Sequence, residues 1–333
     1  MAVRGTAAGE PSKPDEWQDP SPGTPIPGAT ESWGESRGGP SRPPSTFIAE
    51  DSADYPEQLR AVEHPPGLYV RGSLAREDAL AIAIVGSRRA SPYGLRVATT
   101  LARDLATRGF TIVSGLARGI DTAAHRGALE AGGRTLAVLG SGLDRVYPAE
   151  NRDLARRIAA AGAVLSQFPP GTPPRPYHFP ERNRVIAGLA LGTVVVEAAD
   201  ASGALITAGA AGDFGRLVFA VPGPITSPSS RGTNGLLRDG ATLIRDWTDV
   251  VSELPSAWRD CVRVDVPPPE PRETAAEGDE ALVLASLGDD PLPIDRIIEH
   301  SGLGSGRAAA ALIGLEVKGW ARQMDGQRYV RWR

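Results

Sequence analysis

The sequence is poor in residues that form disulfides or hold metals. Cys261 is its one cysteine in 333 residues, which excludes an internal disulfide framework and a cysteine-rich zinc site. Four histidines are scattered along the chain, at His64, His125, His178 and His300. Because their spacing is not that of metal ligands, we expect no metal and no other cofactor.

Long apolar runs are missing as well. No run reaches the roughly 20 residues that a membrane-spanning helix needs. The N-terminus also lacks the apolar core of a signal peptide. We therefore expect a cytoplasmic protein with no membrane partner.

An excess of positive charge is also absent. The formal net charge is −4 and the isoelectric point is about 5.7, which argues against a uniformly basic nucleic-acid-binding protein. A local basic groove is still compatible with this balance, because binding depends on local charge. Lysine occurs at Lys13 and Lys318 alone, so arginine must supply the positive charge of any such groove.

The composition divides the chain into four parts. Residues 1–45 are rich in Pro, Gly, Ser and Glu without periodicity, which predicts a disordered segment. Residues 46–262 alternate between strand-like and helical patterns, and residues 263–278 form a Pro- and Glu-rich linker. Residues 279–333 form a second, compact unit. The length suits one large α/β domain with smaller parts.

The large unit shows a regular alternation of buried strands and helices. The strand-like segments are Ala81–Val85, Thr111–Ser114, Thr135–Leu139, Ala163–Ser166, Thr193–Ala198, Leu217–Val221 and Ala241–Ile244. The helical segments are Leu95–Arg108, Ile120–Ala131, Asn151–Ala161, Glu181–Leu191 and Ala204–Phe214. This order predicts an α/β fold with a doubly wound, Rossmann-like parallel sheet that helices cover on both faces. We interpret residues 46–77 as a short lead-in.

The C-terminal unit has the pattern of a winged-helix domain. Its three helical segments are Glu280–Leu287, Ile294–Ser301 and Ser305–Lys318. Two strand-like segments follow, joined by the turn-forming pair Asp325-Gly326. Winged-helix domains often bind duplex DNA through the third helix, yet here that helix has almost no side chain able to contact a base edge. We favour a role in protein interaction or weak backbone contact, and we expect Trp320 and Trp332 to fill the small core.

One strand-to-helix junction gives the strongest indication of a binding site. The apolar run Ala81–Val85 ends in Gly86, Ser87, Arg88 and Arg89, and a helical pattern follows. Backbone N–H groups and the positive end of a helix dipole suit a phosphate there, which could belong to a nucleotide or to a nucleic-acid backbone. The spacing is not Gly-x-Gly-x-x-Gly, so a dinucleotide site is not the first interpretation.

Three further segments should meet this junction, because ligands of a doubly wound sheet lie at the carboxyl ends of its strands. They are Ser114–His125, Gly140–Pro148 and Tyr177–Gly188. They bring guanidinium groups, which suit bidentate phosphate contact, and aromatic rings that could stack on unpaired bases. The candidate nucleic-acid-binding residues are Gly86, Ser87, Arg88, Ser114, Gly115, Arg118, Gly119, Phe179, Arg182, Asn183 and Arg184.

The order of these motifs resembles that of the DprA/Smf family of DNA-processing proteins. The matching segments are Ile82–Gly94, Ser114–His125, Gly140–Pro148, His178–Gly188, Glu197–Ala208 and Val218–Gly223. The resemblance implies a non-enzymatic, homodimeric protein that binds single-stranded DNA without sequence preference. It also implies that the protein protects incoming strands in natural transformation and loads the RecA recombinase onto them. By the same match, Ser87 and Arg88 are strand-binding residues, and Arg182–Arg184 belong to a basic pocket.

The chain departs from the family pattern in three respects. Many members begin with a small helical domain, where this chain has residues 1–45. Family pockets use lysine as well as arginine, and the core of this chain has no lysine. Asp200 stands where relatives often have a basic residue, so we expect weaker binding at that edge.

Several candidate residues also have a purely structural interpretation. Arg118 could pair with Asp121 one turn further on, and Asp121 could be a surface or capping group. Arg182 and Arg184 cannot face the same way on one helix, so only one should point into the crevice. Phe179 could fill the core instead of offering a stacking platform.

The main alternative is a Rossmann-like nucleotide-processing enzyme of the nucleoside-monophosphate phosphoribohydrolase type. Such enzymes use a Gly-Gly-x-Gly-Thr-x-x-Glu segment. Here Gly192 to Glu197 lacks the preceding glycine pair and has one residue more of spacing. Glu197 is the one carboxylate in the crevice that could be catalytic, but it has no partner base or metal ligands. We expect His125 to be a structural histidine instead of a general base.

Overall fold

The computed structural model describes residues 45–264, 266, 276–288, 291–324 and 326–332. The predicted disorder of residues 1–45 lies outside this range, apart from Ser45, and so does most of the predicted linker. Among the described residues, no helix has both the length and the apolar composition to cross a membrane.

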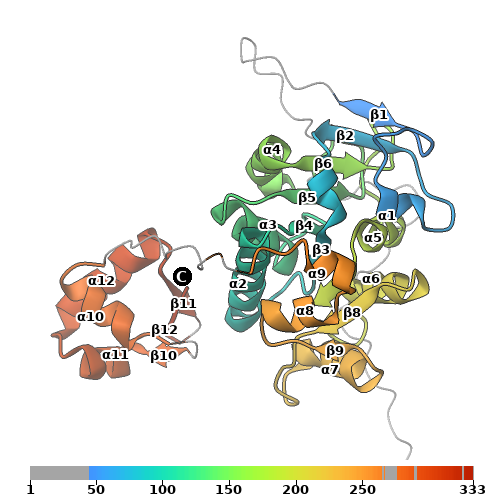
Figure 1. The fold of residues 1–333 in the computed structure, drawn as a ribbon. Helices are drawn as coiled ribbons and strands as arrows, with labels where there is room; N and C mark the ends of the chain where they lie inside the picture. The colour runs from blue at the N-terminus through green and yellow to red at the C-terminus, as the bar shows by residue number, and fades with distance from the viewer. Residues whose placement is uncertain (1–44, 265, 267–275, 289–290, 325, 333) are drawn as a thin grey trace, which may run out of the picture.

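The first part of the chain forms one mixed sheet between two layers of helices (Figure 1). Its strands are β1 Thr46–Ile48, β2 Leu68–Gly72, β3 Ala81–Val85, β4 Thr111–Ser114, β5 Thr135–Leu139, β6 Ala163–Ser166, β7 Gly192–Val195, β8 Leu217–Ala220 and β9 Thr242–Leu243. Within the described residues their order is β1-β2-β6-β5-β4-β3-β7-β8-β9. The seven strands from β6 to β9 pair in parallel. The predicted doubly wound, Rossmann-like α/β fold is confirmed.

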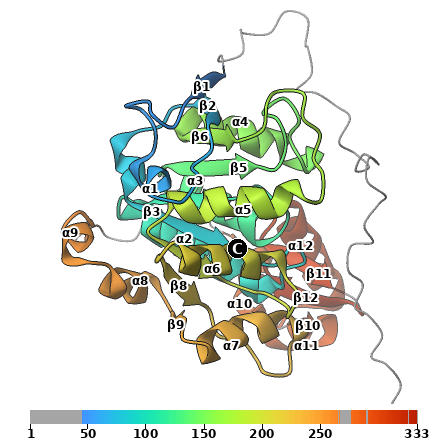
Figure 2. The ribbon, with the colours of Figure 1, turned by 90° about the vertical axis from the view of Figure 1, so that its right-hand side faces the viewer.

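The helices are distributed over both faces of this sheet. They are α1 Glu57–Arg60, α2 Pro92–Thr107, α3 Ile120–Glu130, α4 Arg152–Ala161, α5 His178–Leu189, α6 Gly203–Asp213, α7 Arg231–Arg238, α8 Trp247–Glu253 and α9 Ser256–Arg259. Helices α2 and α3 pack on one face, where Leu105 and Phe110 are buried. Helices α5 and α6 cover the other, where Ile186 is buried (Figure 2). Because both faces are covered, every residue of β3, β4 and β5 is buried.

The lead-in is part of the sheet, which the sequence interpretation missed. Strand β2 pairs antiparallel with β6, and β1 pairs antiparallel with β2. These two strands extend the parallel sheet at one edge. The sheet is therefore mixed, with its antiparallel part far from β3.

The C-terminal part forms a winged helix. Its elements are α10 Asp279–Ser286, β10 Leu292–Pro293, α11 Ile294–Ser301, α12 Ser305–Val317, β11 Ala321–Met324 and β12 Arg328–Arg331. The strands form a small antiparallel sheet in the order β10-β12-β11. Trp320 is buried in the core of this part, as expected. Trp332 is only half-buried and lies outside that core, so its predicted role as a core residue is wrong.

Candidate nucleic-acid interface

A shallow pocket at the carboxyl edge of the sheet gathers residues from four segments. This arginine pocket has a cavity of about 20 Å³ and is lined by Arg88, Gly115, Ala117, Arg118, Tyr147, Pro148, Phe179 and Arg182. The segments follow β3, β4 and β5 or open α5. Since β5, β4 and β3 are adjacent strands, their carboxyl ends lie side by side, and the loops meet as the topology predicts.

Phe179 lies between two arginines of the pocket. Its ring centroid is 5.2 Å from the guanidinium carbon of Arg88 and 5.8 Å from that of Arg182. The ring of Tyr147 lies 6.0 Å away, centroid to centroid. Phe179 is half-buried, so it both packs against the pocket wall and offers ring surface at the mouth. The sequence interpretation did not single out Tyr147, although its segment was expected at this edge.

Arg118 forms an exposed ion pair that the sequence did not predict. Its Nε and Nη2 donate to the two carboxylate oxygens of Glu150, at 2.6 and 2.8 Å. The suggested pairing with Asp121 is wrong. Both partners are more than half exposed, and such surface pairs stabilise a protein by only about 0–1 kcal/mol. A phosphate can therefore compete with Glu150 for Arg118 at little energetic cost.

Arg182 and Asp121 form the buried floor of the pocket. The Nη1 of Arg182 donates to the carbonyls of Gly115 and Val138, at 2.5 and 2.6 Å. Asp121 accepts the backbone N–H groups of Gly115 and Ala117, at 3.1 and 3.3 Å. Through these two contacts Asp121 caps the loop after β4. Asp121 is only 6% exposed, so the alternative interpretation of Asp121 as a surface group is wrong.

The charges of this floor are set by burial. Burial lowers the pKa of Arg182 to about 10, and the attraction of Asp121 opposes this shift. Burial also raises the pKa of Asp121, and the attraction of Arg182 opposes this rise. Arg182 therefore stays protonated at neutral pH and adds positive potential below the pocket.

The side chains of three predicted site residues lie outside the arginine pocket. Arg184 is exposed on the far side of α5, where its guanidinium carbon lies 4.8 Å from the ring centroid of Phe214. The hydroxyl of Ser114 is buried and donates to the carbonyl of Ile84 at 2.7 Å. The side chain of Asn183 is held by Arg182 and by the carbonyl of Gly203. Of the two arginines of α5, Arg182 is the one that faces the crevice.

The loops that carry Arg88 and Arg118 are joined through Ser87 and Gly119. The carbonyl of Ser87 accepts the backbone N–H of Ile120 at 3.2 Å, and the hydroxyl of Ser87 accepts the backbone N–H of Arg89 at 3.1 Å. A Cβ on Gly119 would lie 2.2 Å from the Ser87 carbonyl oxygen, and one on Gly86 would lie 2.7 Å from the side chain of Ile120. The predicted glycines thus permit close approach of the two loops.

The expected phosphate site at the start of α2 is occupied by a side chain of the protein. Glu197 accepts the backbone N–H of Ser91 at 2.9 Å and the Ser91 hydroxyl at 2.5 Å. Its carboxylate lies against Gly94 in the first turn of the helix and compensates the helix dipole there. Glu197 is 3% exposed. The carboxylate that the enzyme hypothesis needs is therefore engaged in helix capping.

Comparison with known proteins identifies the family. A family model described as DNA recombination-mediator protein A matches residues 46–255. The chain is 40% identical to Protein Smf of Escherichia coli over 297 residues, which cover 88% of this chain and 79% of the relative. The chain belongs to the DprA/Smf family. A second model, the DprA winged helix domain, matches residues 267–327.

Two solved DprA structures share the fold. The structure of DprA from Streptococcus pneumoniae superposes with a TM-score of 0.60 at 41% identity, covering 63% of this chain and 75% of that one. DprA from Helicobacter pylori, described for its single-stranded DNA binding mode, gives 0.56 at 30% identity, covering 62% and 94%. Both sequence identities are 30% or more, so membership of one family explains why the three proteins have the same sheet.

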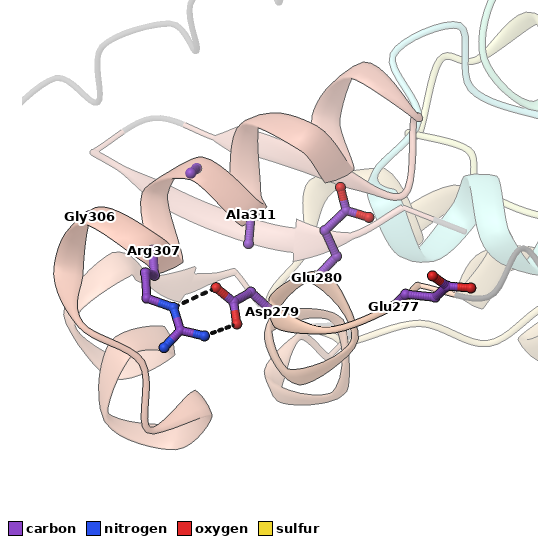
Figure 3. A pocket seen from close by; sticks show the side chains of 7 residues that line it. Glu277, Asp279, Glu280, Gly306, Arg307 and Ala311 are labelled. Atoms are coloured by element: carbon purple, nitrogen blue, oxygen red, sulfur yellow. Dashed lines mark hydrogen bonds and ion pairs between the residues drawn. The ribbon is translucent and has the colours of Figure 1, made fainter.

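A wider hollow in the winged helix of this DprA/Smf protein has the wrong charge for a phosphate. It measures about 520 Å³ and is lined by Glu277, Asp279, Glu280, Gly306, Arg307, Ala310 and Ala311. Figure 3 shows Arg307 paired with Asp279, and Glu277 and Glu280 beside them. Asp279 neutralises Arg307 and Lys318 pairs with Glu280, so the carboxylate of Glu277 leaves the hollow with a net negative charge. Among the described residues, no cluster of His, Cys, Asp and Glu could hold a metal that would reverse this charge.

His125 is a fully buried histidine below the edge of the sheet. The Thr135 hydroxyl donates to the Ile112 carbonyl, so its oxygen accepts the Nδ1–H of His125 at 2.7 Å. Burial, assisted by the charge of Arg182, lowers the pKa of His125 to about 3. The imidazole is therefore neutral at neutral pH, as a structural histidine should be.

The low pKa of His125 predicts a loss of stability in mild acid. Between about pH 6.5 and pH 3, His125 is protonated in the unfolded chain but not in the folded protein. The free energy of unfolding therefore falls as the pH falls. From about pH 7 to pH 5 this contribution amounts to about 2 kcal/mol. Urea unfolding at both pH values measures it. The His125→Asn variant should be less stable at neutral pH but lose that much less on acidification; an unchanged pH slope would refute the assignment.

Proposed function

We propose that the protein binds single-stranded DNA without sequence preference at the arginine pocket. The observation that carries this proposal is the meeting of two exposed guanidinium groups, Arg88 and Arg118, with the ring of Phe179 at one mouth. Membership of the DprA/Smf family and the description of the Helicobacter pylori relative support it.

The dimensions of the pocket favour stacking over enclosure. A cavity of about 20 Å³ cannot take in a nucleobase, so a base would lie against the ring of Phe179 at the mouth. Stacking of this kind contributes about 1–3 kcal/mol per base and tolerates every base. Arg88 and Arg118 would contact the flanking phosphates, which carry no sequence information. Binding without sequence preference follows from this division of roles.

We also propose the cellular role that the family suggests. The protein would act without catalysis as a cytoplasmic homodimer that protects incoming strands and promotes RecA loading in transformation and recombination. The capping role of Glu197 supports a non-enzymatic function. Co-sedimentation of RecA with protein-coated strands would test the loading step, and analytical ultracentrifugation the dimer.

Titration of fluorescent oligo-dT with the full chain tests the binding site. We expect Arg88→Ala to weaken binding about tenfold at moderate salt, because a charge-assisted phosphate contact and a neighbour of the stacking ring are lost. The log–log dependence on salt should become shallower by about 0.7 for each phosphate contact removed. Oligo-dA and oligo-dC should show the same loss.

Arg184→Ala is the matched control for this titration. Arg184 is an exposed arginine of α5 outside the arginine pocket, so its removal changes the net charge equally and should leave affinity within about twofold. Equal losses in both variants would show that binding follows overall charge, and the proposed site would be wrong. Loss with only one oligonucleotide sequence would contradict the absence of sequence preference.

A further inference from the structure

A short motif occurs twice in residues 1–44 of the chain. It is a tryptophan with one carboxylate two residues before it and another two residues after it, and its copies are Asp15–Asp19 and Glu31–Glu35. The other tryptophans of the chain do not have this pattern. Both copies precede Ser45, where the described part of the chain begins. The motif is therefore a feature of the N-terminal segment, residues 1–44.

The spacing of the motif puts its three side chains in one row whenever the backbone is extended. Residues two apart then point to the same side and lie about 6.5 Å from each other. Pro14 and Pro20 flank the first copy and disfavour a helix there. The row consists of a negative charge, a flat aromatic ring and a second negative charge. Phosphate, base and phosphate follow one another in the same order along an unpaired DNA strand, so the motif resembles the ligand proposed for the arginine pocket.

The arginine pocket offers the complementary groups. Arg88 and Arg118 are exposed and line one pocket with Phe179, whose ring centroid lies 5.2 Å from the guanidinium carbon of Arg88. Within the described part of the chain, no carboxylate forms an ion pair with Arg88. A tryptophan ring can stack on Phe179 while the carboxylates beside it pair with the two arginines.

Carboxylates of the protein already take the place of phosphate at this edge of the sheet. Glu150 accepts the Nε and Nη2 of Arg118 at 2.6 and 2.8 Å, which is the bidentate arrangement that a phosphate also uses. Glu197 likewise occupies the start of α2. Because the pair of Arg118 and Glu150 is exposed, another carboxylate can replace Glu150 at little energetic cost. Arg118 therefore suits a carboxylate ligand as well as a phosphate.

The sheet order gives the distance that the N-terminal segment must cover. Ser45 precedes β1, and β3 is the fifth strand along from β1, about 24 Å away at the usual spacing of strands. Strand β1 runs in the same direction as β3, so Ser45 lies at the amino edge of the sheet. The pocket lies at the carboxyl edge, one strand length further, which adds about 17 Å for the residues of β3. The path is therefore about 40 Å long.

The first copy of the motif covers this distance easily and the second does not. Trp17 stands 28 residues before Ser45, and an extended chain of that length spans about 95 Å. Trp33 stands 12 residues before Ser45, which gives about 40 Å at full extension and no slack for a path around side chains. The copy at residues 15–19 is therefore the one suited to the pocket.

We propose that residues 15–19 of this chain dock in the arginine pocket and compete there with single-stranded DNA. In the docked state the ring of Trp17 stacks on Phe179, and the carboxylates on either side of it pair with Arg88 and Arg118. The proposal rests on the proposed function, since competition requires that DNA binds at this pocket. A ligand on the same chain as its site acts at an effective concentration of about 1 mM. Even a weak contact therefore occupies the pocket for much of the time, and DNA must displace it.

Titration of fluorescent oligo-dT with the full chain measures the competition. Trp17→Ala leaves the net charge unchanged and should tighten binding about threefold to tenfold, the factor expected when a competitor with a Kd of about 0.1–0.5 mM is removed from an effective concentration of about 1 mM. Trp17→Phe keeps a ring that can stack and should restore most of the competition. Trp33→Ala is the matched control, because it makes the same change in the copy that lacks the reach, and it should alter affinity by less than about twofold.

A second pair of variants tests the carboxylates. Asp15→Asn/Asp19→Asn should tighten binding of oligo-dT at least about threefold, because the charged contacts to the arginines are lost. Glu31→Gln/Glu35→Gln changes the net charge equally and should have a much smaller effect. Equal gains in the two variants would show that affinity follows the overall charge of the segment, and the docking of residues 15–19 would be wrong.

The indole N–H signal of Trp17 in the NMR spectrum of the full chain reports docking directly. Its loss in Trp17→Phe assigns it. Addition of oligo-dT should shift this signal, and Arg88→Ala should shift it in the same direction without DNA, because both changes release the segment. The signal of Trp33 should respond to neither change.

The outcomes separate this proposal from the proposed function. If Arg88→Ala weakens DNA binding but Trp17→Ala binds as the unchanged protein does and the Trp17 signal stays in place, the docking is wrong and the proposed function stands. Weaker binding by Trp17→Ala would mean that this ring contacts DNA, which contradicts competition. If neither the unchanged protein nor Trp17→Ala binds oligo-dT, the proposed function is wrong, and the competition with it.

Discussion

Replacing Arg182 by methionine should lower the free energy of unfolding by about 3–5 kcal/mol, because removal of one partner leaves a buried charge uncompensated. Arg182 is 4% exposed and Asp121 6%. Without the guanidinium, the Asp121 carboxylate keeps its two backbone donors but loses the positive charge that stabilises it most. The carbonyls of Gly115 and Val138 also lose a charged donor.

Urea unfolding measures this loss, and two further variants show its cause. Arg184→Ala, on the exposed side of the same helix, should change stability by less than about 0.5 kcal/mol. Adding Asp121→Asn to Arg182→Met should recover part of the loss, because the carboxylate that needs a cation is gone. A loss below about 1 kcal/mol for Arg182→Met, or no recovery in the double variant, would contradict the compensating role of the pair.

The central strands could be predicted because their burial on both faces leaves an unbroken apolar pattern. Ala81–Val85 and Thr135–Leu139 have the same bounds in the sequence interpretation and in the structure. Strands β1 and β2 could not be found in this way. They are partly exposed, and three prolines lie between them. Their place depends on the antiparallel pairing of β2 with β6, about 95 residues further on.

The site could be predicted to the level of loops but not of side-chain partners. Topology brings Arg88, Arg118 and Phe179 together. The partner of Arg118 lies 32 residues away at Glu150, and no local spacing indicates it. The choice between Arg182 and Arg184 was within reach of the sequence. Arg182 has the helical spacing of the apolar residues Val185, Ile186 and Leu189, which marks it as the buried one.

The contact between Ser87 and Gly119 should make Gly119→Ala one of the most damaging small substitutions. Gly119 has φ +71° and ψ −124°, a conformation that L-residues avoid at a cost of about 1–3 kcal/mol. The added Cβ would also lie 2.2 Å from the Ser87 carbonyl oxygen, so one of the two loops must move. Together these effects should lower the free energy of unfolding by about 3 kcal/mol or more.

Comparison with Gly132→Ala separates the steric part of this effect from the backbone strain. Gly132 has a similar φ of +67°, but nothing lies within 4 Å of its Cβ position, so only the backbone strain of about 1–2 kcal/mol should appear. Since movement at Ser87 displaces Arg88 from Arg118, Gly119→Ala should also weaken oligo-dT binding at temperatures where the variant is folded, whereas Gly132→Ala should not. Equal destabilisation by the two variants, with unchanged binding in both, would mean that the loops do not depend on this contact for their positions. The close approach of Gly119 to Ser87 is thus the point at which backbone conformation, stability and the geometry of the arginine pocket can be tested together.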